Sequence, residues 1–139
     1  MGGYGAIRVG MKYPDTFGKI IALSSALIIH NIKNGSHEMY SEIADYDYFE
    51  STFGDLNKIE DSETNPEYLI MKLKQAGKTI PPLYMACGTE DYLLNENRAL
   101  RDFLSKNEID VTYVEGRGIH DWVFWNEYIA KAVEWCVKD

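Results

Sequence analysis

The chain has 139 residues, of which 45% are hydrophobic and 26% are charged, and this composition is typical of a single globular domain rather than a disordered segment. Its 22 acidic and 14 basic residues leave a net charge of −8 without a basic patch, which argues against nucleic acid or an anionic membrane as a partner. The longest apolar run, residues 20–29, is interrupted by two serines and is shorter than the roughly 20 residues that a membrane-spanning helix needs.

The first predicted elements are a helix over residues 3–13 and a strand over residues 19–24. Small residues in the helix reduce its intrinsic stability, but they would let it lie close to a sheet. Pro14 ends the helix, because a proline pushes the preceding residue out of the α region. Residues 19–24 form a continuous apolar run, which is typical of a strand buried on both faces.

Residues 28–61 have no clear period, and we expect them to form a long, lid-like insertion. The segment is rich in aromatic side chains, namely Tyr40, Tyr46, Tyr48, Phe49 and Phe53. These rings either pack among themselves or line a substrate pocket, and the sequence leaves both interpretations open. His30 and His37 also lie here, but no spacing resembles a metal-ligand motif, so no metal site is expected.

The rest of the chain alternates helices with strands. Asn65 and Pro66 begin a helix cleanly, as N-cap and first helical residue, and Gly77 is a plausible stop. From there onward we predict a helix over residues 66–76, a strand over 83–87, a helix over 95–107, a strand over 111–114 and a helix over 122–137.

The last helix is predicted to have an apolar face, formed by Trp122, Trp125, Ile129, Ala132, Val133 and Cys136. The two cysteines of the chain, Cys87 and Cys136, are too few for a disulfide framework and are expected to be small buried residues. This pattern favours a reducing, cytoplasmic setting.

Strands that alternate with helices predict an α/β fold, with a three-stranded parallel sheet flanked by helices. A sheet of only three strands is too narrow to shield the helices on both of its faces from water. We therefore expect the chain to hold about half of a larger sheet. The first strand, over residues 19–24, would then have an unpaired edge where a neighbouring strand belongs.

Residue types suited to catalysis follow two of the strands. Residues 88–92 read Gly-Thr-Glu-Asp-Tyr, and residues 116–122 read Gly-Arg-Gly-Ile-His-Asp-Trp. The carboxyl ends of parallel strands lie at one edge of a sheet, so a carboxylate from the first loop can accept a hydrogen bond from His120. Asp91, Glu90 and Asp121 are candidates for that carboxylate.

Three motifs together resemble the putative-esterase (esterase D-like) branch of the α/β hydrolases, with tributyrin esterase-like members as the best match. Residues 1–6, Met-Gly-Gly-Tyr-Gly-Ala, resemble the sequence that follows the nucleophilic serine of the G-x-S-x-G elbow. Residues 87–91 resemble the acid loop, and residues 118–125 resemble a G-x-H-x-W-x-x-W histidine loop. The resemblance covers the whole chain.

This resemblance implies a serine carboxylesterase with a Ser-Asp-His triad, in which Asp91 is the acid and His120 the base. The backbone N–H of Met1 would be an oxyanion donor, because the residue after the nucleophile has that role. Tyr92 and Trp122 are candidates for the substrate pocket. The mechanism requires no cofactor and no metal, and short acyl chains are expected in the substrate.

The same resemblance places the serine directly before Met1, so residues 1–139 are expected to be the C-terminal portion of an α/β-hydrolase domain and to be inactive alone. Ser24 and Ser25 lack the glycines of an elbow, and Cys87 lies within a strand, so none of them is expected to replace the serine.

An alternative interpretation is a non-catalytic association module. The strand over residues 19–24 would expose a sheet edge that could pair with a second copy of the chain or with a separate N-terminal half of a split hydrolase.

Overall fold

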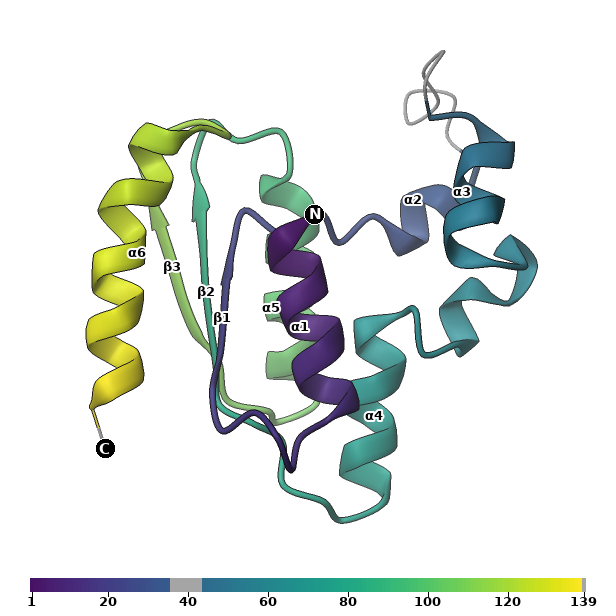
Figure 1. The fold of residues 1–139 in the computed structure, drawn as a ribbon, viewed down its shortest axis with the longest axis horizontal. Coiled ribbons are helices and arrows are strands. Elements are labelled where there is room, and N and C mark those ends of the chain that lie inside the picture. The colour runs from purple at the N-terminus through teal and green to yellow at the C-terminus, as the bar shows by residue number, and fades with distance from the viewer. Residues whose placement is uncertain (36–43, 139) are drawn as a thin grey trace.

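The computed structural model describes residues 1–35 and 44–138. A three-stranded parallel sheet lies at its centre in the order β1-β2-β3 (Figure 1). The strands are β1 (Ile20–Leu23), β2 (Leu83–Gly88) and β3 (Thr112–Gly116). The main helices are α1 (Gly2–Lys12), α4 (Pro66–Gln75), α5 (Leu94–Lys106) and α6 (Trp122–Val137). The predicted α/β class and parallel sheet are confirmed.

The helices form two layers around the sheet. Helices α1, α4 and α5 cover one face, and α6 covers the other (Figure 1). In the strand register, Leu23 pairs with Ala86, and Gly88 pairs with Gly116. Because all three strands run in one direction, the loops that follow them leave the sheet at the same edge.

Side-chain caps explain where several helices begin. Asn65 accepts a hydrogen bond from the N–H of Glu67 at 3.1 Å, and Pro66 occupies the first turn of α4. Asp121 caps α6 in the same way, accepting from the N–H of Phe124 at 3.0 Å. The N-cap predicted at Asn65 is therefore confirmed.

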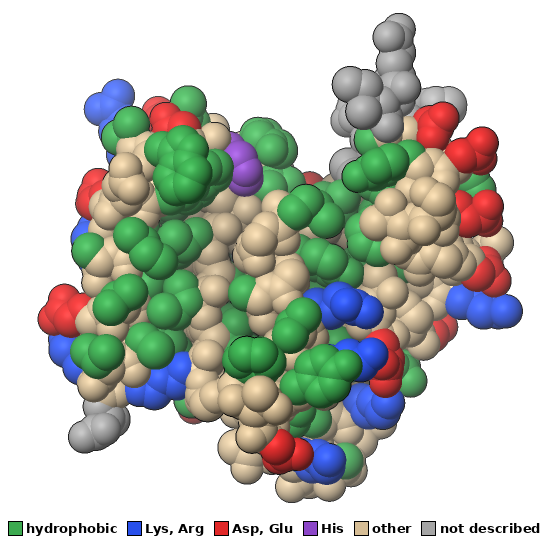
Figure 2. Space-filling view, viewed as in Figure 1, with side chains coloured by type: hydrophobic (Ala, Val, Ile, Leu, Met, Phe, Trp, Pro, Cys, Tyr) green, Lys and Arg blue, Asp and Glu red, His purple; other side chains and the backbone are tan. Residues whose placement is uncertain are grey.

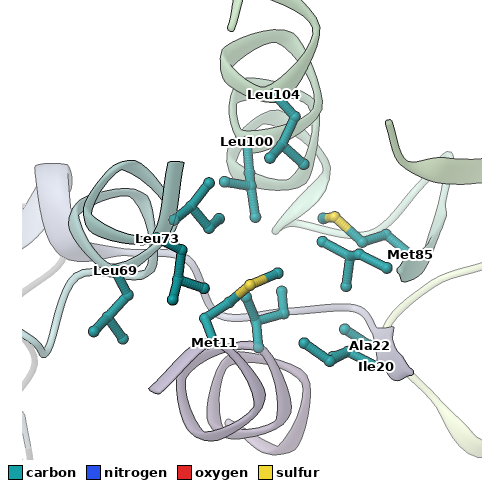
Figure 3. Packing of buried hydrophobic residues seen from close by; sticks show 11 residues of the cluster. Met11, Ile20, Ala22, Leu69, Leu73, Met85, Leu100 and Leu104 are labelled. Atoms are coloured by element: carbon teal, nitrogen blue, oxygen red, sulfur yellow. The ribbon is translucent and has the colours of Figure 1, made fainter. Parts of the chain in front are cut away.

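The main core lies between the sheet and the layer of α1, α4 and α5 (Figure 3). Met85 of β2 is completely buried there, together with Ile7 of α1 and Leu104 of α5. Gly10 lets α1 approach β1 closely, since a Cβ at this position would lie 2.4 Å from Cδ1 of Ile20. The expected role of small residues in this helix is confirmed at Gly10.

The aromatic-rich insertion expected over residues 28–61 is present, but it differs from the prediction in that much of it is helical. It contains α2 (Ile29–Lys33), α3 (Tyr46–Phe53) and a 3₁₀ helix, η2 (Leu56–Asp61), while Tyr40 and His37 lie outside the described residues. These helices have five to eight residues, too few turns for a helical period to stand out in the sequence.

We call α2, α3 and η2 the side lobe, which projects away from the sheet in Figure 1. Its core gathers Ile32, Phe49 and Ile59 around Tyr4 of α1. Phe49 and Phe53 stack at 6.2 Å between ring centroids, and Phe53 meets Tyr4 edge to face at 6.0 Å. Phe49 and Phe53 thus belong to a packing cluster, whereas Tyr46 and Tyr48 of the same segment are exposed.

A second prediction, the one for the apolar face of α6, is wrong in part. Phe124, Tyr128 and Ala132 are its buried residues, whereas Ile129 and Val133 are 44% and 49% exposed. Figure 2 shows hydrophobic side chains at the surface over α6. Trp122, Val123 and Val137 of α6 are exposed as well.

The two cysteines are free and differ in burial. Cys87 is buried as predicted, but Cys136 is partly exposed, which corrects the expectation for that residue. None of the helices in the described ranges is both long enough and apolar enough to cross a membrane.

Candidate active site

Two loops meet at the carboxyl edge of the sheet, one after β2 and the other after β3. The N–H of Thr89 donates to the carbonyl oxygen of Gly116 at 2.8 Å, and the N–H of Glu90 donates to that of Gly118 at 3.0 Å. These backbone hydrogen bonds fasten the first loop to the second, so side chains of the two loops are held at short range.

Gly88, at the end of β2, permits this close approach. A Cβ at Gly88 would lie 2.2 Å from the carbonyl oxygen of Gly118 and 2.7 Å from its carbonyl carbon. Both are backbone atoms, which cannot move aside as the end of a flexible side chain can. Any larger residue at position 88 would therefore push the two loops apart.

Asp91 and His120 form a hydrogen-bonded pair across these loops. Nδ1 of His120 lies 3.0 Å from Oδ2 of Asp91 and 3.2 Å from Oδ1. The Asp91 side chain is fully buried, while the His120 side chain is 22% exposed. Since a carboxylate only accepts, the proton belongs on Nδ1, and Nε2 is left free to accept one. The pair can act as a base and the acid that orients it.

Local hydrogen bonds hold the Asp91 carboxylate in place. Oδ1 accepts from the N–H of Leu93 at 2.9 Å, in the turn that leads into α5. The other two acids considered from the sequence point elsewhere. Glu90 is more than half exposed and lies 4.0 Å from Arg117, and Asp121 caps α6. Among the described acids, Asp91 is the one that the fold joins to His120.

Aromatic rings surround the imidazole of His120. The Tyr92 ring lies 4.9 Å from it at 43°, and the Trp125 ring lies 4.9 Å from it at 90°. Trp122 contacts Trp125 edge to face at 5.3 Å. Tyr92 and Trp122 are both about three-quarters exposed, at 74% and 73%.

A pocket of about 220 Å³ adjoins His120. Its walls are formed by Met1, Gly2, Gly3, Leu23, Ser24, His120 and Trp125. The start of α1, the end of β1 and the histidine loop thus share one cavity. Met1, which the sequence suggested as an oxyanion donor, lies in the same pocket as the suggested base.

Neither Ser24 nor Cys87 suits the part of a nucleophile. The Ser24 hydroxyl accepts a hydrogen bond from Nε1–H of Trp125 at 3.1 Å, and among the described residues it has no hydrogen bond to the His120 ring that would take its proton. The Cys87 thiol is fully buried, and this burial, with the nearby charge of Asp91, raises its pKa to about 12. A thiol with that pKa is not ionised at neutral pH.

His30, the described histidine of the side lobe, has a structural role. Nδ1 of His30 lies 2.8 Å from Glu60, and Nε2 lies 3.1 Å from Glu67. In the described part of the chain, no group of three or more His, Cys, Asp or Glu residues could hold a metal ion. His30 therefore joins η2 to α4, and His37 lies outside the described residues.

Three residues of this region were missed by the sequence reasoning. Ser24 and Trp125 line the pocket, and Asn97 of α5 binds the backbone of Ser25 beside it. Trp125 was noticed only as part of a motif and of the predicted apolar face of the last helix. A signal for Asn97 did exist, because an amide sits on the apolar side of an amphipathic helix among leucines.

Comparison with known proteins identifies relatives of this chain. The model of the family described as Putative esterase matches residues 1–136. An acetyl esterase from Caldicellulosiruptor saccharolyticus is 51% identical over 138 residues, which cover 99% of this chain and 52% of that protein.

Two solved structures from Staphylococcus aureus have the same arrangement. The S-formylglutathione hydrolase FrmB has a TM-score of 0.82 at 31% identity, with 99% of this chain and 52% of that chain covered. The fluorophosphonate-binding serine hydrolase FphF has a TM-score of 0.83 at 30% identity, with 99% and 51% covered. The chain therefore spans about half the length of the proteins that it matches.

Proposed function

This chain belongs to the Putative esterase family of serine hydrolases, and from that membership we propose that its site supplies the acid and the base of a carboxylesterase. The observation that carries the proposal is the hydrogen bond of 3.0 Å between Nδ1 of His120 and Oδ2 of Asp91. It supports the proposal because it leaves Nε2 as the proton acceptor, in a ring that borders the pocket.

In the proposed reaction, a serine outside residues 1–139 attacks the acyl carbon of an ester. Nε2 of His120 takes the hydroxyl proton, and Asp91 stabilises the imidazolium that results. The N–H of Met1, as part of a longer chain, would donate to the oxyanion. His120 returns the proton to the departing alcohol, and water then repeats the steps, which releases the acid and restores the serine.

The substrate that we propose is a carboxylic ester with a short acyl group. The 51% identical relative is called an acetyl esterase, and the pocket beside His120 has a volume of about 220 Å³. Tyr92 and Trp122 remain our candidates for further contacts with the substrate, because both rings are exposed close to the catalytic pair. The chemistry calls for no cofactor.

We also propose that the polypeptide of residues 1–139 is inactive by itself. Neither Ser24 nor Cys87 is available as a nucleophile at the site, and the relatives are about twice as long. We keep the cytoplasm as the proposed compartment, because both cysteines are free thiols.

The test compares two polypeptides on p-nitrophenyl acetate. Residues 1–139 should hydrolyse it no faster than buffer, whereas a chain that carries a strand ending in Gly-x-Ser before Met1 should be active. In that longer chain His120→Ala should lower kcat by about 10⁴- to 10⁶-fold. His30→Ala, which removes another histidine paired with carboxylates, should leave kcat unchanged. Activity of residues 1–139 that is lost in His120→Ala would refute the proposal.

A second candidate function is association through β1. In the described part of the chain, β1 pairs with β2 alone, so its other edge has no strand partner. Exposed apolar side chains of α6, among them Ile129 and Val133, extend the apolar surface of the molecule. Such an edge could accept a second copy or a separate N-terminal half.

For this candidate we expect residues 1–139 to self-associate at tens of micromolar. Light scattering should then give a mass near twice 15.9 kDa. A single species of monomer mass across that range would exclude self-pairing, and addition of the N-terminal half as a separate polypeptide would then show whether the edge accepts that partner instead.

A further inference from the structure

Ser24, directly after β1, has an unusual backbone conformation. Its φ is +44°, a region that residues with a side chain rarely occupy, and the residue is 2% exposed. The surrounding structure holds it there. The N–H of Ser24 donates to the carbonyl oxygen of Ala86 at 2.8 Å, and Asn97 binds both the N–H and the carbonyl oxygen of Ser25. Strain maintained in this way next to a pocket indicates a function for the side chain.

The constrained side chain of Ser24 reaches Trp125. Its Oγ accepts the indole Nε1–H at 3.1 Å, which joins β1 to the first turns of α6 across 101 residues of sequence. A partly buried indole needs such an acceptor, because an unpaired N–H away from water is costly. The hydrogen bond therefore sets how the Trp125 ring lies in the pocket.

Trp125 in turn limits how the His120 ring can move. The hydrogen bond to Asp91 holds Nδ1, but it leaves the imidazole able to swing about that contact. The Trp125 ring stands at 90° to the imidazole with 4.9 Å between centroids, so it blocks that motion. We propose that Ser24 and Trp125 are positioning residues, which together hold the His120 ring so that Nε2 faces the pocket.

The positioning proposal can be tested on residues 1–139 by NMR of the His120 ring. Ser24→Ala removes the acceptor, and Ser24→Gly removes it while tolerating the positive φ, so that strain and hydrogen bonding are separated. Trp125→Phe keeps a ring but removes the donor. In these variants the order parameter of the His120 ring should fall from about 0.85 to below about 0.6, with the proton still on Nδ1.

Matched controls come from the same elements. Ser25→Ala changes the neighbouring buried serine, whose hydroxyl has no partner among the described residues. Trp135→Phe changes a tryptophan near the other end of α6, which packs on Tyr84. Both controls should leave the His120 ring as in the parent chain. An unchanged ring in Ser24→Gly and in Trp125→Phe would overturn the proposal.

The effect of this positioning on catalysis rests on the proposed function. Kinetics of the longer chain, which contains the serine, can test the positioning and the proposed function separately. There, Ser24→Gly and Trp125→Phe should lower kcat about tenfold with KM changed less than about twofold, because orientation is lost rather than binding. Absence of esterase activity in the longer chain without substitutions would refute the proposed function, while the NMR result on residues 1–139 still decides the positioning. An active enzyme with unchanged kcat in both variants would refute the positioning alone.

Discussion

At the scale of single residues, the candidate site depends on how closely two backbones approach. Asp91 and His120 are 29 positions apart, and each belongs to a loop with little structure of its own. The loops meet because Gly88 has no side chain at the point where the backbone of Gly118 crosses it. The geometry of the pair is therefore set partly by a residue that contacts neither side chain.

Gly88→Ala is predicted to destabilise the chain by about 3 kcal/mol, because its Cβ would overlap backbone atoms that cannot move without separating the loops. Urea unfolding measures this loss. The control is Gly5→Ala in α1, where a Cβ would meet nothing within 4 Å. That variant should gain up to about 1 kcal/mol, since alanine favours a helix over glycine. Equal stabilities for the two variants would contradict the explanation.

At the scale of elements, β1 and α5 are held together by one buried amide. Asn97 has no exposed surface, and its Oδ1 accepts from the N–H of Ser25 at 3.1 Å. Its Nδ2 donates to the carbonyl oxygens of Ser25 and Leu93, at 2.9 and 2.8 Å. Strand β1 has ended at this point, so the N–H of Ser25 has no place in the sheet and depends on Asn97. The two carbonyl oxygens also accept from backbone N–H groups, of Leu27 at 2.9 Å and of Asn97 itself at 3.1 Å.

Asn97→Leu is predicted to cost about 1 to 3 kcal/mol, because it leaves the buried N–H of Ser25 without a partner. Thermal and urea unfolding would measure the loss. Asn95→Leu places the same side chain at an exposed position of the same helix and should change stability by less than about 0.5 kcal/mol. If Asn97→Leu proved as stable as Asn95→Leu, Asn97 would not hold these two elements together.

At the scale of the whole molecule, the side lobe is fastened to the sheet domain by polar contacts as well as by packing. His30 of α2 contacts Glu60 of η2 and Glu67 of α4, and Lys33 also pairs with Glu60. The hydroxyl of Tyr4 donates to the carbonyl oxygen of Thr64 at 2.6 Å. One titratable ring thus takes part in joining the lobe to the rest of the chain.

This arrangement predicts a pH-dependent stability. Burial alone would lower the pKa of His30, but hydrogen bonds and the charges of Glu60 and Glu67 outweigh it and raise that pKa above 6.5. The stabilisation is therefore complete below about pH 6.5 and is lost as the pH rises through the higher folded value. At the acid end, Lys33 and then His30 lower the pKa of Glu60 below 4.5, so its contribution is lost as the pH falls through that lowered value.

His30→Gln should therefore destabilise the chain more at pH 5.5 than at pH 8.5. The difference should be below about 1 kcal/mol, because the ring is nearly half exposed and water screens its ion pairs. Urea unfolding at the two pH values measures it. Lys33→Gln is the control, since the raised pKa of Lys33 keeps its ammonium group charged at both values. A His30→Gln effect that did not vary with pH would exclude the titration of this ring as the cause.

Much of the fold could be predicted because its signals are local. The cap at Asn65, the glycine-containing face of α1 and the apolar run of β1 act within a few residues, so they can be read along the chain. The acid and histidine loops could be placed at one sheet edge as well, because parallel strands bring their carboxyl ends together.

The side lobe and the outer face of α6 could not be predicted in this way. Helices as short as α2 and α3 have little stability of their own and depend on packing around Tyr4, which is distant in sequence. The exposed Ile129 and Val133 form an apolar pattern like that of a buried face, and only the position of α6 on the sheet determines which side is covered.

The sequence by itself therefore determined the α/β class, the order of the strands and of the main helices, and the two loops that carry Asp91 and His120. Only the tertiary structure decided how these two side chains are held. It joined Asp91 rather than Glu90 or Asp121 to the imidazole, and it placed Trp125 against that ring through Ser24, 101 residues away. Such contacts depend on how closely distant segments pack, and no local pattern of residues encodes that distance.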